Sequence, residues 1–260
     1  MSLYSVEPNE YVTFKLRHED EHIVVVDKPT GVPSQPGLGH DTDTLLNGLF
    51  AKYGQRLQNL GKDRDFGMLH RLDRKASGLL IIALTNKAYD AMRRQFQERT
   101  IGKFYWVVVK GAPSTPSGVI NKPIAESIPK GPGSIKRGKI SSKGKEAVTA
   151  FRVLEQGRDA SLIECRPVTG RLHQIRVHME MIGCPVLGDE IYASPQIKAA
   201  APRLALHSHR VVFTHPVTGG KVDVTSTWPR DLRGTLERFG LARPDLHVAP
   251  GSAGGDDAES

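Results

Sequence analysis

Short apolar segments of strand length recur along this chain. Residues 22–27 (HIVVVD) and 78–84 (GLLIIAL) are almost continuously apolar, which is typical of strands buried on both faces. Residues 103–109 (KFYWVVV) are rich in β-branched and aromatic side chains, which favour strands. Two further strands are predicted at residues 148–154 and 162–166, with a turn between them.

The C-terminal part carries the clearest hairpin pattern. In residues 205–227, two runs of alternating apolar and polar residues flank the turn sequence HPVTGG. Because a tight turn between two such runs brings them together as antiparallel partners, these residues predict a β-hairpin. Helical patterns lie between the strands, and helices are predicted over residues 41–53, 86–99 and 231–239.

A fourth helix is predicted over residues 168–183 (VTGRLHQIRVHMEMIG). Its apolar residues recur at steps of three and four and form one stripe along the helix, made of Leu172, Ile175, Met179 and Ile182. Arg171, His173 and Arg176 fall outside this stripe, so we expect them on the polar side.

The order of these elements predicts the fold class. Hairpin-like neighbours dominate and only a few helices are inserted, which indicates an α+β domain with a largely antiparallel mixed sheet and flanking helices and loops. We expect an N-terminal extension at residues 1–21, one domain at 22–239 and a disordered tail at 240–260, which is rich in Gly, Ala and Asp.

One long connection, residues 112–146, has no clear strand or helix pattern and is strongly basic. Its glycine-rich part predicts an arm that is mobile when free and contacts phosphates, and a solvated basic loop is the alternative interpretation. The basic residues of this arm are Lys130, Lys136, Arg137, Lys139, Lys143 and Lys145.

Composition and charge narrow the class of protein. The 260 residues are 38% hydrophobic and 25% charged, without the run of about 18 apolar residues that a membrane span needs. No secretory signal is visible at the N-terminus, and two cysteines suit a reducing cytoplasm. The net charge is +8, and residues 1–239 alone hold 35 basic and 24 acidic residues, a net charge of +11. Such a balance favours a polyanionic partner, above all nucleic acid.

The segment LHRLDRKASGLL, residues 69–80, looks most like a reactive centre. It places Asp73 beside Arg71 and Arg74 and then leads into an apolar strand. Nearby positive charges favour an ionised carboxylate, which can act as a nucleophile, a base or a metal ligand. A solvated charge cluster at the edge of a strand is the alternative at this point.

Other kinds of site fit the chain poorly. His173 and His178 are five residues apart, which on a helix turns them about 140° from each other and away from a shared metal. His207, His209 and His215 are joined by no cluster of Cys or carboxylate residues, so we expect no zinc site. The chain also lacks the nucleotide-binding motifs of a phosphotransferase and the GxSxG motif of a hydrolase.

Five blocks of sequence together resemble the RluA family of RNA pseudouridine synthases. They are VDKPTGVPS, HRLDRKASGLLIIAL, KFYWVVVKG, PVTGRLHQIRVHMEMIGCPVLGDEIY and RLALHSHRVVFTHPVTG, in the order of the family. Ala76 and Leu172 depart from the residues usual at their positions. No S4-like RNA-binding module is visible before the first block, so the chain resembles the short, single-domain members.

The resemblance implies the pseudouridine synthase catalytic fold and a reaction in which a uridine in RNA is detached at N1, rotated and rejoined through C5. Asp73 is then the expected nucleophile, attacking either C1′ of the ribose or C6 of the base. Arg176 is the expected cation beside it, and Tyr105 is expected to stack on the flipped-out uracil and to take the C5 proton late in the reaction.

RNA contacts are expected from eight basic residues, and Arg71 would occupy the space left by the flipped-out base. These residues are Arg71, Arg74, Lys130, Lys136, Arg137, Lys139, Arg171 and His173. No cofactor and no metal are implied, and the partner is ribosomal RNA, transfer RNA or both, bound by a monomer. A non-catalytic RNA-binding or ribosome-assembly protein on the same fold remains the alternative.

Overall fold

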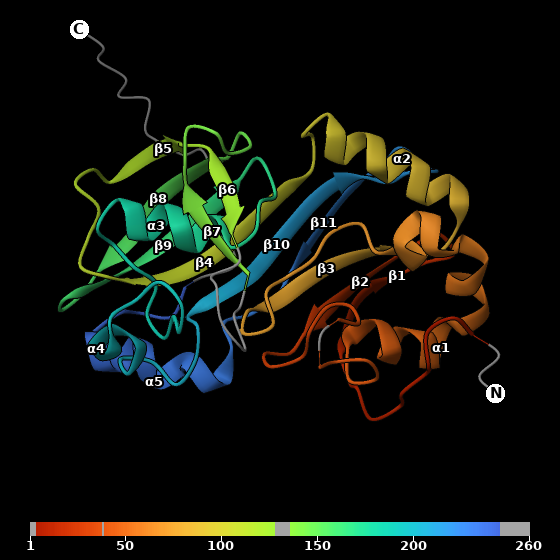
Figure 1. Cartoon of the computed structure of the whole chain (residues 1–260), viewed down its shortest axis with the longest axis horizontal. Helices are drawn as coiled ribbons and strands as arrows, with labels where there is room; N and C mark the ends of the chain where they lie inside the picture. The colour runs from red at the N-terminus through yellow and green to blue at the C-terminus, as the bar shows by residue number, and fades with distance from the viewer. Residues whose placement is uncertain (1–3, 38, 128–135, 245–260) are drawn as a thin grey trace, which may run out of the picture.

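The computed structural model describes residues 4–37, 39–127 and 136–244. A nine-stranded mixed sheet forms the centre of the described structure (Figure 1). Its order is β1 (Lys15–Glu19), β2 (Ile23–Lys28), β3 (Ser77–Ala83), β10 (Leu206–Thr214), β4 (Gly102–Lys110), β9 (Ala160–Pro167), β8 (Val148–Gln156) and β5 (Ser117–Asn121), with β11 (Lys221–Thr225) paired to β10.

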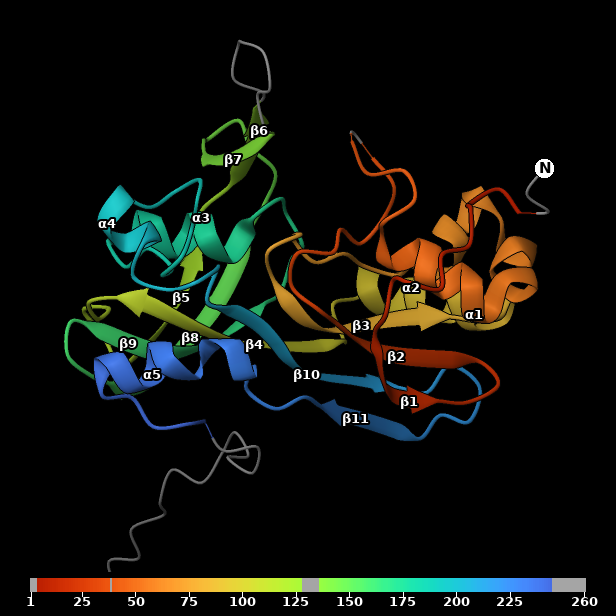
Figure 2. The same ribbon diagram turned by 90° about the horizontal axis from the view of Figure 1, so that it is seen from below.

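The helices cover this sheet on both faces. Figure 2 shows α1 and α2 over one end of a face, and α3 with the separate hairpin β6–β7 over the other end of the same face, while α5 lies on the opposite face. The bounds of these elements are α1 (Leu45–Leu60), α2 (Asn86–Gln97), β6 (Ile124–Ser127), β7 (Arg137–Ile140), α3 (Gln174–Met181), α4 (Pro195–Lys198) and α5 (Arg233–Phe239), with short 3₁₀ turns at Lys62–Gly67 and Arg230–Leu232.

Strand β10 joins the two halves of the sheet. It pairs with β4 along one side, and with β3 and then β11 along the other, and the contact with β3 is parallel. Gly78 in β3 has φ +112°, and a Cβ at this position would come within 2.2 Å of the carbonyl oxygen of Ser208. Only glycine therefore fits where the loop of Asp73 enters the sheet beside β10.

The main predictions of the fold are confirmed. All seven residues of β3 are buried, as the continuous apolar run indicated, and β2 and β4 are present where they were predicted. The hairpin β10–β11 and the antiparallel pair β8–β9 are also present. The class is α+β with a mostly antiparallel mixed sheet and flanking helices, and a single hydrophobic core takes in most of the buried apolar side chains.

Several elements differ from the predictions. Strand β1 lies inside the predicted N-terminal extension, and the connection 112–146 contains the strands β5, β6 and β7. Their short, polar and glycine-rich sequences carry no periodic signal. Helix α1 begins after the cap residue Thr44 and continues to Leu60, seven residues beyond its predicted end. Leu241, which the predicted tail included, is buried in the core, whereas residues 245–260 lie outside the described residues.

The fourth predicted helix is much shorter than its apolar stripe indicated. Helix α3 begins only at Gln174, because His173 has a left-handed backbone conformation with φ 52°. The side chain of Gln174 accepts hydrogen bonds from the Thr169 hydroxyl and the Arg171 amide, so the residues before the helix form a hydrogen-bonded turn. Arg171 and His173 therefore lie on this turn and not on the helix.

Candidate active site

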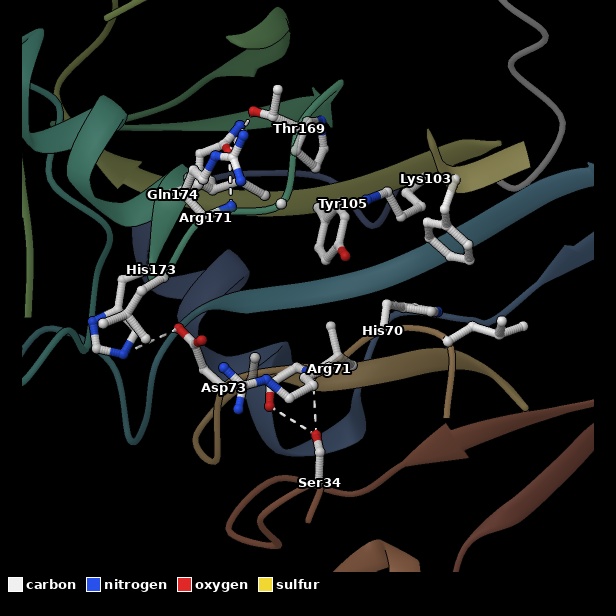
Figure 3. A pocket seen from close by; sticks show the side chains of 18 of the residues that line it. Ser34, His70, Arg71, Asp73, Lys103, Tyr105, Thr169, Arg171, His173 and Gln174 are labelled. Atoms are coloured by element: carbon white, nitrogen blue, oxygen red, sulfur yellow. Dashed lines mark hydrogen bonds and ion pairs between the residues drawn. The ribbon is translucent and has the colours of Figure 1, made fainter. Parts of the chain in front are cut away.

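A cavity of about 860 Å³ lies on the face of the sheet that carries α2 and α3. Its walls come mainly from four parts of the chain. They are the loop 33–37 after β2, the loop 69–76 between the first 3₁₀ turn and β3, strand β4 with the end of α2, and the turn 167–173 with the start of α3. Figure 3 shows Asp73 and His173 facing one another, with Tyr105 projecting from β4 above them. Residues far apart in sequence thus share one site.

Asp73 is held by a buried arginine. Nη1 of Arg176 donates a hydrogen bond of 2.8 Å to Oδ2 of Asp73. The same guanidinium binds Asp189 through two parallel hydrogen bonds, Nε to Oδ2 at 2.7 Å and Nη2 to Oδ1 at 2.8 Å. Side-chain exposure is 6% for Arg176, 1% for Asp189 and 23% for Asp73. One arginine therefore bridges a fully buried carboxylate and a carboxylate that opens into the cavity.

The charges of this cluster support one another. Burial alone would raise the pKa of Asp189, but its hydrogen bond to Arg176 and the positive charge hold that pKa below its usual range. Burial alone would lower the pKa of Arg176, but Asp189 and Asp73 together raise it above its usual value. The Asp189 carboxylate also accepts the backbone amides of Ile191 and Tyr192. Arg176 is thus fixed in charge and in position before any substrate arrives.

A second chain of contacts orients His173. The Tyr192 hydroxyl accepts a hydrogen bond from the backbone amide of Gly138 in β7, so its own proton is free to go to Nδ1 of His173, 2.9 Å away. Burial lowers the pKa of His173, which favours the neutral ring. With Nδ1 as acceptor, the ring proton lies on Nε2, and Nε2 is 4.0 Å from Oδ2 of Asp73. Tyr192 also lies against Arg176, with its ring centre 5.1 Å from the guanidinium carbon.

Tyr105 forms part of the cavity wall from the centre of the sheet. It lies on β4, opposite Ser208 of β10 and Cys165 of β9, and is 7% exposed. Burial, together with the negative charge of Asp73, raises the pKa of Tyr105 to about 12. Its side chain is therefore a neutral phenol at neutral pH.

The backbone of the Asp73 loop is tied down by a second loop, residues 28–34. Oγ of Ser34 donates to the carbonyl of Leu72 at 2.9 Å and accepts the amide of Leu72 at 3.1 Å. The Thr30 hydroxyl donates to the carbonyl of Lys75, and Nζ of the fully buried Lys28 donates to the carbonyl of Ala76. Asp73 is thus presented on a loop whose peptide groups are hydrogen-bonded on both sides of it.

Comparison with known proteins identifies the family. The sequence profile described as RNA pseudouridylate synthase matches residues 22–181. The chain belongs to this family. It is 37% identical over 239 residues to the ribosomal large subunit pseudouridine synthase D of Zymomonas mobilis, covering 87% of this chain and 73% of that protein. It is 36% identical over 224 residues to the dual-specificity RNA pseudouridine synthase RluA of Escherichia coli K12, covering 85% of this chain and 96% of that protein.

Solved structures agree with this assignment. The human RNA pseudouridylate synthase domain containing 4 has 25% sequence identity and a TM-score of 0.68, covering 88% of this chain and 94% of that chain. The human RNA pseudouridylate synthase domain containing 1, at 24% identity and a TM-score of 0.65, shares the fold, covering 92% of this chain and 100% of that chain. The resemblance to the RluA family is confirmed, and the enzymes of the pseudouridine synthase family are isomerases.

The structure brings together Asp73, Tyr105 and Arg176, the three residues predicted for catalysis, around one cavity. The contact between Arg176 and Asp73 is the one that the family resemblance implied. Arg176 is nevertheless 5% exposed, so the expectation of a position on the polar, outer side of a helix is wrong. The carboxylate cluster explains this burial, because Asp189 neutralises the arginine within the protein.

The predicted RNA-binding residues are more scattered. Arg71, Arg74, Arg171 and His173 line the cavity, and Nε of Arg171 donates to the carbonyl of Glu146. Nη1 of Arg74 points to Nε2 of His40, 2.6 Å away, so Arg74 is already partnered and is not the cation beside Asp73. Lys136, Arg137 and Lys139 lie exposed at or next to β7, where Lys136 is paired with Glu126. Lys130 lies outside the described residues.

Sequence reasoning missed the residues that support the site. Asp189 and Tyr192 lie in the block GDEIY, and Lys28 and Ser34 lie in VDKPTGVPS. Both blocks were part of the family resemblance, yet no periodicity or charge pattern showed that these side chains would meet the loop of Asp73 or Arg176. Only the fold brings them there: Asp189 binds Arg176, which in turn reaches Asp73 across 103 residues of sequence.

Among residues 4–37, 39–127 and 136–244, no group of three or more His, Cys, Asp or Glu side chains is arranged to hold a metal ion. His207, which the sequence brought up as a possible ligand, instead lies between the hydroxyls of Ser77 and Ser226. Within the same part of the chain, no helix combines the length and the apolar character needed to cross a membrane.

Replacing Ser34 by alanine is expected to loosen the loop of this pseudouridine synthase. The Ser34→Ala change leaves the amide and carbonyl of buried Leu72 without partners, so we expect unfolding to become easier by about 1–3 kcal/mol. We also expect a lower kcat with little change in KM, because Asp73 follows Leu72 directly. Denaturant unfolding and steady-state kinetics measure the two effects.

Ser117→Ala is the matched control, since Ser117 is exposed on β5 and does not line the cavity. Its stability should change by less than about 0.5 kcal/mol. Equal stability and equal kcat in Ser34→Ala and Ser117→Ala would show that the Ser34 contacts do not hold the loop.

Proposed function

We propose that this enzyme converts specific uridines in structured RNA to pseudouridine, with Asp73 as the nucleophile that attacks a flipped-out uridine. The observation that carries this proposal is the Asp73 carboxylate, the one acidic group among the described residues that line the cavity, 2.8 Å from a buried arginine whose charge is already shared with Asp189. Two of the hydrogen bonds that Arg176 donates go to Asp189, and one goes to Oδ2 of Asp73. Arg176 therefore orients Asp73 but leaves its other carboxylate oxygen, Oδ1, without a hydrogen bond from this arginine. The Asp73 carboxylate is therefore available to form a covalent bond.

The proposed reaction needs no net addition or loss of atoms. The bond between N1 of uracil and C1′ breaks, the base rotates, and a bond between C5 and C1′ forms, while a proton leaves C5 and N1 gains one. Asp73 attacks C1′ of the ribose or C6 of the base. The ring of Tyr105 supplies the surface on which the uracil stacks.

The proton on C5 must then leave, and Tyr105 is the proposed acceptor. Since the raised pKa of about 12 keeps Tyr105 protonated at neutral pH, its hydroxyl can take the C5 proton only by passing its own proton to a second base. Tyr105 therefore acts as a relay in this proposal and not as a free phenolate.

The proposed substrate is ribosomal RNA, transfer RNA or both. The name of the relative from Zymomonas mobilis refers to the large ribosomal subunit, and that of the relative from Escherichia coli refers to a dual specificity. Arg71, Arg171 and the exposed basic residues of the β6–β7 hairpin supply positive charge around the cavity for phosphates. No observation favours the alternative, a non-catalytic RNA-binding or ribosome-assembly protein on the same fold.

A monomeric state and a cytoplasmic location are also proposed, both from the sequence. The two cysteines, Cys165 and Cys184, are buried as free thiols, which is compatible with a reducing compartment. Light scattering of the purified protein and fractionation of cells test these two points separately from the chemistry.

Release of tritium tests the reaction itself. Transcripts of ribosomal and transfer RNA labelled with tritium at C5 of uridine are incubated with the purified full chain, and the tritium that reaches water is counted. Pseudouridine formation removes the C5 proton. We therefore expect the released tritium to reach a plateau that corresponds to a whole number of uridines per RNA molecule. RNA binding without any release from either class of RNA would contradict the enzyme and favour a binding protein.

A further inference from the structure

A buried lysine without a counter-charge lies in the wall of the cavity. Lys103 on β4 is 8% exposed, and among the described residues its ammonium group makes no hydrogen bond and no ion pair. The aromatic ring of Phe96 lies beside it, with Nζ 5.5 Å from the ring centre. Removing an ammonium ion from water is costly unless a partner compensates, so this arrangement points to a missing anion.

The position of Lys103 relates that anion to the reaction. Lys103 and Tyr105 are two residues apart on β4, so both side chains leave the same face of the sheet (Figure 3). The rise of a strand separates them by about 7 Å along β4. Both line the cavity that also holds Asp73. An anion bound at Lys103 would therefore lie next to the ring of Tyr105, on which the uracil is proposed to stack.

A second donor faces the same part of the cavity. Nε2 of His70 accepts the amide of Ile81, which places the ring proton of a neutral His70 on Nδ1. Among the residues described, this Nδ1 has no hydrogen-bond partner, and the His70 ring lies 5.4 Å from Phe96, the ring that Lys103 also contacts. Arg93, exposed on α2, lines the same cavity and adds positive charge near its rim.

We propose that Lys103 and His70 form a binding subsite for one phosphodiester group of the RNA, next to the flipped-out nucleotide. This inference rests on the proposed function, since it needs an RNA substrate in the cavity. A phosphodiester carries the single negative charge and the acceptor oxygens that an ammonium ion and a neutral N–H donor can share. Lys103 would thus be a substrate-binding residue that fixes the register of the RNA backbone.

The environment of Lys103 agrees with this geometry. Burial lowers the pKa of Lys103 to about 8, and no carboxylate acts in the opposite direction. A phosphate bound beside the ammonium group would favour its charged form and raise this pKa again.

Neutral phosphate analogues test the subsite. The probe is a synthetic RNA stem-loop that carries a uridine converted by the wild-type enzyme, with a single uncharged methylphosphonate placed at each phosphate near this uridine in turn. Single-turnover kinetics give the half-saturating enzyme concentration for the wild type and for Lys103→Met. At one phosphate we expect the analogue to raise this concentration about tenfold in the wild type and less than twofold in Lys103→Met.

Lys103→Met on the unmodified stem-loop should itself raise the half-saturating concentration about tenfold. The matched control is Lys110→Met, because Lys110 lies on the same strand, is partly exposed and pairs with Asp159 outside the cavity lining. The control should bind as the wild type does. Thermal unfolding of Lys103→Met should occur at or above the wild-type temperature, since an apolar chain replaces a buried, unpaired charge.

Two results would overturn the subsite. In one, the variant and the methylphosphonate act independently at every phosphate, so that their effects multiply. In the other, Lys103→Met binds RNA normally and unfolds at a lower temperature, which would assign the lysine a purely structural role. Failure of the wild type to convert uridine in any ribosomal or transfer RNA would instead contradict the proposed function, so the two failures are distinguishable.

Discussion

The substitution Asp73→Asn is expected to reduce pseudouridine formation on the order of 10⁴-fold or more, with RNA binding within about threefold of the wild type. Asparagine keeps the shape of the side chain and an oxygen that can accept the hydrogen bond from Nη1 of Arg176. It removes the negative charge that makes Asp73 a nucleophile. Single-turnover formation of pseudouridine and equilibrium binding of the same RNA measure the two properties.

Asp63→Asn is the matched control, because Asp63 is exposed in the 3₁₀ turn and does not line the cavity. This variant should convert RNA at the wild-type rate. If Asp73→Asn kept activity within tenfold of the wild type, another group would have to be the nucleophile. If it lost RNA binding to the same extent as activity, the loss of rate would report binding and not chemistry.

The substitution Arg176→Met is expected to lower both stability and activity. It leaves the carboxylate of Asp189, with 1% side-chain exposure, without its cation, and breaking a buried ion pair on one side costs about 3–5 kcal/mol. Asp73 also loses the hydrogen bond that orients it, so we expect kcat to fall at least about 100-fold. Denaturant unfolding and kinetics under conditions where the variant is folded give both quantities.

The stability difference should depend on pH in a defined direction. In the wild type, the lowered pKa of Asp189 means that its ionised form stabilises the fold above about pH 4, and that this contribution is lost as the pH falls through that lowered pKa. In Arg176→Met, burial favours protonated Asp189. The difference between the wild type and the variant should therefore be larger at pH 8 than at pH 5.

Arg210→Met is the matched control for the buried cluster. Arg210 also binds a carboxylate with two hydrogen bonds, that of Asp223, but this pair is partly exposed on the hairpin. We expect a loss of no more than about 1 kcal/mol. Equal losses in the two variants would show that the Arg176 cluster has no special role in the fold. If the variant Arg176→Lys kept the stability and activity of the wild type, a positive charge alone would suffice at this position.

The elements that could be predicted from the sequence are those with a clear pattern of apolar and polar residues. The seven buried residues of β3 and the alternating runs of β10 and β11 carry strong local signals, and each was predicted close to its observed place. Strands β6 and β7 have no such signal. Their short segments become strands because they pair with each other beside α3, a tertiary contact that local sequence does not encode.

The candidate site divides in a similar way. The charged segment around Asp73 was visible as a reactive centre, and the family resemblance placed Tyr105 and Arg176 beside it. The cation at Asp73 could not be chosen from spacing, because Arg71 and Arg74 are its neighbours in sequence but Arg176 is its partner in space. Asp189 acts through Arg176 on α3, and Ser34 acts through Leu72 on the loop of Asp73, and only the folded chain reveals these contacts.

Mapping of pseudouridine in cells tests the central claim most directly. Total RNA is compared at single-nucleotide resolution between cells with the gene, cells without it, and deleted cells that express either the wild type or Asp73→Asn. The account predicts one or a few uridines in ribosomal or transfer RNA that are modified with the gene, unmodified without it, and restored by the wild type alone. Identical maps with and without the gene, or restoration by Asp73→Asn, would contradict it.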